Sequence, residues 1–310
     1  MNERSTNPGG AMTMEYKSDQ AVKFKPRRLG HVNLSVSNLE RSMAFYTKVL
    51  GIEEVRRERD IKAGFLSNGN THHDVALIEV GILATQAGLN HLGWESENEV
   101  QLVKAYQRAQ QAGLKINFTA NHQISRGVYM SDPEGNGHEF YADAMKDWRT
   151  IMRPDRFDMI TAEWTPGEPP PDSEPKYNPH PEIRWVEGAV FHPKRVAQAT
   201  FAVRDMEKMT HFFTEVSGLE KVGRAPDDSC IVLRGALPGQ DLTLLQVGKG
   251  QPTGLHHFSF EMANESDLDQ AEVEMRKAGI KPELRVDNEA KRSIFLRDPD
   301  DFLVEFYVGR

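Results

Sequence analysis

The chain has 310 residues, a formal net charge of −8 and a pI near 5.8. This acidic balance excludes most proteins that bind nucleic acids or anionic membranes, because their contact surfaces are basic. The length is typical of about two domains. The single cysteine, Cys230, excludes an internal disulfide framework and indicates a reducing compartment. We therefore expect a soluble, cytoplasmic protein.

The first segment, residues 1–27, has no apolar run of signal-peptide length. No later run approaches the length of a membrane span. The polar composition of residues 1–27 predicts a flexible N-terminal tail.

An internal repeat organises the rest of the chain. The segment HVNLSVSNLERSMAFYTKVLGIEEV, from His31, matches QATFAVRDMEKMTHFFTEVSGLEKV, from Gln198, in its apolar and charged positions. Further on, GLNHLGW matches GLHHFSF, which places His91 opposite His257. The interval from His31 to Glu79 also equals the interval from His91 to Glu139, so each half divides into two modules.

The sequence pattern of each module predicts a strand, a helix and three further strands. Apolar periodicity predicts helices over Asn38–Leu50, Asn98–Gly113 and Ser266–Gly279. The predicted fold class is α+β, with domains at residues 28–145 and 194–310. Residues 146–193 are rich in proline and acidic residues, a composition that predicts a linker. Tryptophans flank the Pro-rich part of this linker, so we expect the linker to lie against the folded body.

The stretch ANHQISRGVYMSDPEGNGHEFYAD, residues 120–143, predicts a hairpin. β-forming residues surround Tyr129 and Phe140, and the Asp132-Pro133 turn lies between them. The spacing from His122 through Tyr129 to Glu139 resembles the signature of the extradiol ring-cleavage dioxygenases. These enzymes belong to the vicinal oxygen chelate (glyoxalase and bleomycin resistance) superfamily. The resemblance covers about residues 28–145 and 194–310, and it implies two tandem domains, each a curved half-barrel sheet built from two modules.

The same resemblance implies a metal site. Strand alternation puts His31 and His91 on the face opposite their apolar neighbours. Together with Glu139 they would form a two-histidine, one-carboxylate set, which suits Fe(II) and also accepts Mn(II). The implied substrates are a catechol and dioxygen, and members of the family often form homo-oligomers, as we expect here.

Three more residues take roles from the resemblance. His73, in the segment HHDVAL, matches the position of the acid/base histidine of the catechol 2,3-dioxygenases. His122 and Tyr129 match the histidine and tyrosine that orient the substrate oxygens. The implied activity is extradiol cleavage in the N-terminal half.

The second half retains few of these residues. His257 and Glu305 persist, whereas the remaining positions are replaced: Gln198 for His31, Gln240 for His73, Asn288 for His122 and Phe295 for Tyr129. Glutamine is a poor Fe(II) ligand, so this half is expected to be a structural copy. Two-domain extradiol enzymes more commonly hold iron in the C-terminal half, so the predicted arrangement is inverted.

Two points stay open in the sequence. His31 could pair with His91 and Glu139, as short connections favour, or with His257 and Glu305. The function could also be that of a glyoxalase-type lyase or isomerase with Glu79 as a fourth ligand, or of a metal-free binding protein of the bleomycin-resistance kind. We expect Glu79 to lie near the metal without binding it, and metal analysis would separate the three functions.

Overall fold

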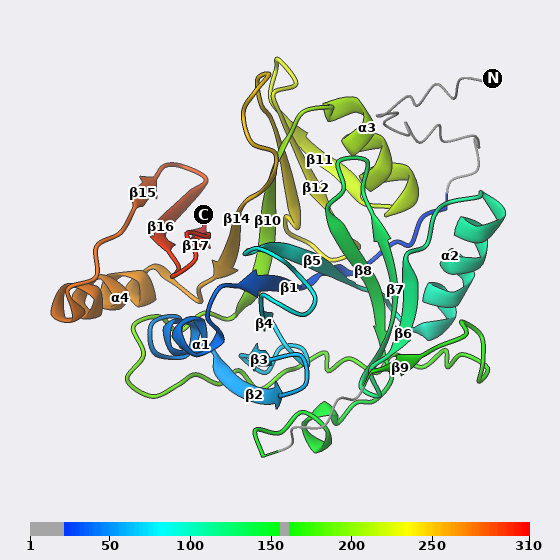
Figure 1. Ribbon diagram of the computed structural model, residues 1–310. Coiled ribbons are helices and arrows are strands. Elements are labelled where there is room, and N and C mark those ends of the chain that lie inside the picture. The colour runs from blue at the N-terminus through cyan, green and yellow to red at the C-terminus, as the bar shows by residue number, and fades with distance from the viewer. Residues whose placement is uncertain (1–21, 156–160) are drawn as a thin grey trace, which may run out of the picture.

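The computed structural model describes residues 22–155 and 161–310 (Figure 1), so residues 1–21 of the expected tail lie outside it. The last part of that segment is not a tail. Val22 and Phe24 are buried, and the Phe24 ring stacks on Phe140 with centroids 4.1 Å apart. The guanidinium of Arg108 donates hydrogen bonds to the backbone carbonyls of Val22 and Lys23. Residues 22–27 are therefore part of the folded body, because apolar burial outweighs their polar composition.

The first half follows the predicted order of elements twice. Its elements are β1 (Arg28–Val36), α1 (Leu39–Lys48), β2 (Glu53–Glu58), β3 (Ala63–Ser67), β4 (Val75–Glu79), β5 (Gly88–Glu95), α2 (Glu99–Gln111), β6 (Phe118–Asn121), β7 (Ser125–Ser131) and β8 (Gly137–Asp143). A short 3₁₀ turn, Trp148–Thr150, and β9 (Ala162–Glu163) follow. β9 pairs with β6, so the segment after β8 extends the first sheet.

The second half repeats this order. Its elements are β10 (Arg195–Val203), α3 (Met206–His211), a π-helical turn (Phe212–Val216), β11 (Glu220–Arg224), β12 (Cys230–Arg234), β13 (Leu242–Gln246), β14 (Gly254–Glu261), α4 (Glu265–Ala278), β15 (Leu284–Asp287), β16 (Lys291–Arg297) and β17 (Leu303–Gly309). The two curved mixed sheets with peripheral helices confirm the α+β class and the duplicated module.

Side-chain caps explain where the helices begin. The Oδ1 atoms of Asn38, Asn98 and Asn264 each accept a hydrogen bond from the backbone N–H three residues on. At the end of α4, Gly279 adopts a left-handed φ of 68°, which suits glycine. The bounds of the three predicted helices differ from the observed bounds by at most two residues at either end.

Strand order positions the site. Among the described strands, the first sheet has the order β2-β3-β4-β1-β5-β8-β7-β6-β9. β1 pairs antiparallel with β5 and parallel with β4, and β5 pairs parallel with β8. The three strands that carry His31, His91 and Glu139 are consequently neighbours.

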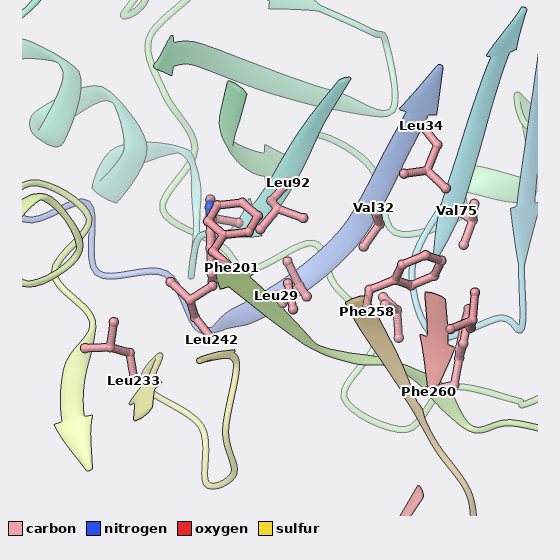
Figure 2. Packing of buried hydrophobic residues seen from close by; sticks show 14 of the residues in the cluster. Leu29, Val32, Leu34, Val75, Leu92, Phe201, Leu233, Leu242, Phe258 and Phe260 are labelled. Carbon is pink, nitrogen blue, oxygen red and sulfur yellow. The ribbon is translucent and has the colours of Figure 1, made fainter. Parts of the chain in front are cut away.

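One hydrophobic cluster joins the two halves. Val32 and Leu34 of β1 lie in the same packed region as Phe201 of β10 and Phe258 of β14 (Figure 2). Alternation along β1 sends His31 to the opposite face. Packing between the halves thus fixes the strand that supplies the first candidate ligand.

The expected linker lies against the first half. Backbone N–H groups of Arg184, Val186 and Phe191 donate to carbonyls of the first module, and Trp164 is buried. No described helix is both long and apolar enough to span a bilayer.

Candidate metal centre

Three buried side chains converge on the concave side of the first sheet. The Nε2 atom of His31 lies 3.0 Å from Oε2 of Glu139 and 3.3 Å from Nε2 of His91. Nε2 of His91 lies 3.3 Å from the same Glu139 oxygen. Ligand atoms about 2.1 Å from one ion are about 3 Å apart at neighbouring octahedral positions. The triangle therefore fits one face of an octahedral metal ion.

The electrostatics of the triangle also suit a cation. Burial raises the cost of ionising Glu139, yet contacts with His31 and His91 hold the pKa of its carboxyl well below 4.5. Burial lowers the pKa of His31 despite the attraction of Glu139, so its imidazole is neutral near pH 7 and free to ligate. Among the described residues, the ion-pair partners of Glu139 are histidines. A buried carboxylate without Lys or Arg requires another positive charge.

The second half shows what replaces that charge. Lys291 forms an ion pair with buried Glu305, which also accepts a hydrogen bond from Ser259. His257 lies 3.7 Å from Glu305 and contacts Thr200 instead. An ammonium group thus neutralises the second carboxylate, whereas Ser125 takes the place of Lys291 in the first half by the repeat.

Two glycines make room for the triangle. A Cβ atom on Gly93 would overlap the ring of His31, and one on Gly127 would overlap Oε1 of Glu139. Gly93, in β5, lies between the two ligands across the sheet, because it is the Cα partner of His31 in β1 and of Glu139 in β8. Sequence reasoning missed both glycines, because Gly93 lies outside the hairpin signature and Gly127 is at one of its variable positions.

The structure places the two modules of the first half together around this site. His31 meets His91 and Glu139, while His257 and Glu305 face each other in the second sheet. Adjacent strands β1, β5 and β8 produce this pairing.

Glu79 lies elsewhere, so the expectation that it lies beside the metal is wrong. Its carboxylate pairs with Lys62 at 2.6 Å and accepts the backbone N–H of Leu39 at 3.0 Å. The cause is strand register: β8 places Glu139 opposite Gly93, but β4 places Ala76 opposite Asn33. Ala76 is therefore the structural counterpart of Glu139. Glu79 is three residues further and faces the other side.

His73 lies directly beside the triangle. Its ring is tilted against that of His31 with centroids 4.1 Å apart, and its Nδ1 lies 2.7 Å from Nδ1 of His72. Its Nε2 is buried without a hydrogen-bond partner, and the side chain lines the cavity described below. Burial and the neighbouring histidines lower the pKa of His73 well below 6.5.

His122 and Tyr129 form a second polar group on the opposite wall. Nε2 of His122 lies 2.9 Å from the Tyr129 hydroxyl, and its Nδ1 lies 2.9 Å from Oγ1 of Thr161. Burial raises the pKa of Tyr129 well above 10, and Glu139 adds to the shift. The phenol is therefore protonated at neutral pH. Thr161 belongs to the expected linker, so that segment contributes to the site.

These groups line a cavity of about 410 Å³. Its lining comes from the sheet, the β4–β5 loop and the segment after β8, and it is largely apolar away from the histidines: Asn33, Arg56, Glu58, Ile61, Phe65, His72, His73, Ile78, Leu83, Asn90, His91, Asn117, Phe118, His122, Ile124, Ser125, Tyr129, Met130, Gly137, His138, Glu139, Met152 and Thr161. All three residues expected to act on the substrate lie on this lining, beside His91 and Glu139.

Known proteins resemble this chain in sequence or in fold. The chain is 24% identical over 287 residues to the catechol-2,3-dioxygenase of Bacillus subtilis (strain 168), covering 87% of this chain and 93% of that protein. The 2,3-dioxygenase LapB from Pseudomonas sp. KL28 has a TM-score of 0.67 at 20% identity, covering 94% of both chains. The Mn(II)-bound glyoxalase from Novosphingobium aromaticivorans also has a TM-score of 0.67, at 15% identity, covering 92% and 82% of the two chains.

The family comparison covers both halves. The model of one family, described as the Glyoxalase/Bleomycin resistance protein/Dioxygenase superfamily, matches residues 28–140 and again residues 195–306. These two matches correspond to the two curved sheets and span more than half of the chain. The protein belongs to the Glyoxalase/Bleomycin resistance protein/Dioxygenase superfamily.

Proposed function

We propose that this protein is an extradiol dioxygenase that opens the ring of a catechol with O2 at Fe(II) held by His31, His91 and Glu139. The observation that carries the proposal is the triangle of ligand atoms 3.0–3.3 Å apart at one end of a largely apolar cavity. The similarity to a catechol-2,3-dioxygenase supports the choice of reaction. We assign catalysis to residues 28–145 and a structural role to residues 194–310.

The number of protein ligands favours this reaction over that of a glyoxalase-type lyase. Ala76 occupies the position from which a fourth side chain would reach the ion, and its methyl group offers no donor atom. When bound, the ion would supply a single centre for both catechol oxygens and dioxygen. Because Mn(II) accepts the same ligands as Fe(II), the assignment of Fe(II) is tested by exchanging the metal.

We assign proton transfer to His73. It is neutral at pH 7, because its pKa lies well below 6.5, and its unpartnered Nε2 lies on the cavity lining. A neutral imidazole there accepts the proton of a catechol hydroxyl and returns it later in the reaction. His72, in contact with the other ring nitrogen, orients His73.

We assign substrate orientation to His122 and Tyr129. The protonated phenol of Tyr129 is a hydrogen-bond donor beside Glu139, and His122 fixes its direction. Thr161 in turn fixes the ring of His122. A substrate oxygen near Glu139 would therefore meet a donor whose direction is already set.

Oxygen uptake tests the proposal. The reaction breaks one ring C–C bond beside the diol and places both atoms of O2 in the product, so no external reductant is required. Protein with verified Fe(II) content should consume one O2 per catechol and form a yellow ring-opened product. Absence of uptake across a broad catechol panel, with iron occupancy confirmed, would overturn the assignment. Loss of activity on chelation and its return with Fe(II) but not Mn(II) would support iron.

A further inference from the structure

The candidate cavity is larger than a single aromatic ring requires. Its volume is about 410 Å³. A dry protein cavity of about 150 Å³ holds one benzene molecule. A catechol bound at the triangle would therefore leave space for a substituent of comparable size to the ring.

The wall beside this extra space is apolar. Ile124 and Met152 belong to a small hydrophobic cluster, separate from the main core, against which Phe65 packs. All three side chains line the cavity, and they come from β3, from the turn before β7 and from the segment after β8. A cluster contributed by three different elements makes a continuous apolar wall, so it favours an apolar group over a hydrated one.

The mouth of the cavity is apolar as well. Leu83 is 56% exposed and Phe118 is 55% exposed, and both line the cavity. The Phe118 ring stacks on Tyr129 with centroids 4.1 Å apart and planes 15° apart. This stack continues from the candidate substrate-orienting group to the surface. Large exposed apolar side chains at the rim of a pocket indicate a ligand-binding surface.

The charged side chains that line the cavity in the described part of the chain do not offer a site for an anionic substituent. Among the described lining residues, Arg56 is the one Lys or Arg side chain. It is fully buried, pairs with Glu58 at 3.3 Å and donates to the carbonyl of Ile151 at 3.3 Å. A carboxylate entering this space would meet a neutralised guanidinium and the negative charge of Glu58.

We infer that the substrate is a catechol bearing a bulky, uncharged apolar substituent, such as a second ring or an alkyl chain. The substituent lies against Phe65, Ile124 and Met152 and reaches the rim formed by Leu83 and Phe118. This inference rests on the proposed function for the position of the diol. It adds the class of substituent and names the side chains that select it.

Binding and turnover test the inference separately. Holoprotein with Fe(II) is titrated without oxygen with catechol, with phenylcatechol and with a catechol that bears a carboxylate, and each Kd is measured by calorimetry. Phenylcatechol should bind at least about tenfold more tightly than either of the others. Oxygen is then admitted to measure kcat/KM for the same three compounds.

Two neighbouring residues provide a matched pair of variants. Leu83→Ala should reduce the preference for phenylcatechol over catechol by about three- to tenfold, because it removes apolar contact area at the rim. Ile82→Ala is the control: Ile82 is 55% exposed but is not on the cavity lining, so this preference should not change. Equal effects of the two variants would overturn the role of the rim.

The outcomes separate the two proposals. Equal affinity for the three compounds, or tighter binding of the carboxylate, overturns the inference even if all are cleaved. Preferential binding of phenylcatechol without oxygen uptake supports the ligand class and overturns ring cleavage. Absence of binding of any of the three overturns both.

Discussion

The carboxylate of Asp74, in the first half, accepts a hydrogen bond from the backbone N–H of Val196, in the second half, at 3.2 Å. Asp241 makes the reciprocal contact by accepting the backbone N–H of Leu29 at 2.7 Å. Asp74 and Asp241 occupy equivalent positions of the internal repeat, as do Leu29 and Val196. Each half thus places a buried carboxylate on the first strand of the other, and β1, which carries His31, is held by this exchange.

Replacement of Asp74 by asparagine should destabilise the fold. One oxygen of Asp74 accepts the N–H of Val196 and the other accepts the N–H of Asn68. Asparagine would turn its NH2 group toward one of these donors and leave that donor unsatisfied. Below about pH 4, where Asp74 is protonated, we expect the free energy of unfolding of Asp74→Asn to be about 1–3 kcal/mol lower than that of wild type. Urea unfolding measures it, and Asp60→Asn, at an exposed position, should leave it unchanged.

The same residue should leave a signature in the pH dependence of stability. Burial raises the pKa of Asp74 to about 6, against the opposing hydrogen bonds from Asn68 and Val196. The folded state therefore holds the proton more tightly than the unfolded chain. The raised pKa of Asp74 therefore adds to the free energy of unfolding. This contribution is complete below about pH 4 and is lost as pH rises through about 6, a change of about 3 kcal/mol. The difference in unfolding free energy between wild type and Asp74→Asn should track this window; a constant difference from pH 4 to 7 would contradict it.

Metal content should depend on one half of the chain. His91→Ala removes one corner of the triangle, so bound metal measured after purification and reloading should fall to background. His257→Ala is the matched variant, because His257 is the counterpart of His91 but lies beside the Lys291–Glu305 pair. It should retain about one metal ion per chain. Loss of metal in His257→Ala with retention in His91→Ala would reverse the assignment of the halves.

Turnover should depend on His73 more than metal binding does. His73→Ala removes the proposed proton acceptor without removing a ligand atom, so kcat should fall by about 10²–10⁴-fold while metal content stays within the range of wild type. Gln240→Ala alters the corresponding position of the second half and serves as the control. A His73 variant that loses its metal would make this residue a ligand, and one with full kcat would exclude it from proton transfer.

The order of elements was predictable because the sequence repeats. Apolar periodicity located the helices, and strand alternation put His31 and His91 on one face. Equal intervals along the chain, however, do not fix strand register. The interval from His31 to Glu79 matches that from His91 to Glu139, yet β4 pairs so that Ala76 takes the equivalent place. Register depends on pairing across the sheet, which no local signal in these strands reveals.

The contributions of distant segments to the cavity and to the core could not be predicted from the sequence either. Met152 and Thr161 were placed in a linker by its composition, but they line the cavity, and Thr161 contacts His122. Val22 and Phe24 looked like part of a polar tail, although both are buried. Each case depends on a tertiary contact between residues far apart in sequence, where composition describes the segment and not its surroundings.

Gly127→Ala should weaken metal binding although Gly127 supplies no ligand. A methyl group there would overlap Oε1 of Glu139 and press on the ring of Tyr129, so the carboxylate that supplies Oε2 to the triangle must shift. We expect the affinity for Fe(II) to fall by about 10–100-fold, as is usual when groups that position metal ligands are altered. Gly88→Ala is the control, because Gly88 also lies in a strand of this sheet and an added Cβ meets nothing within 4 Å. Competition with a chelator of known affinity measures both variants, and circular dichroism verifies that each is folded. Unchanged affinity in a folded Gly127→Ala protein would show that Glu139 does not need its present position, and would remove it from the proposed ligand set.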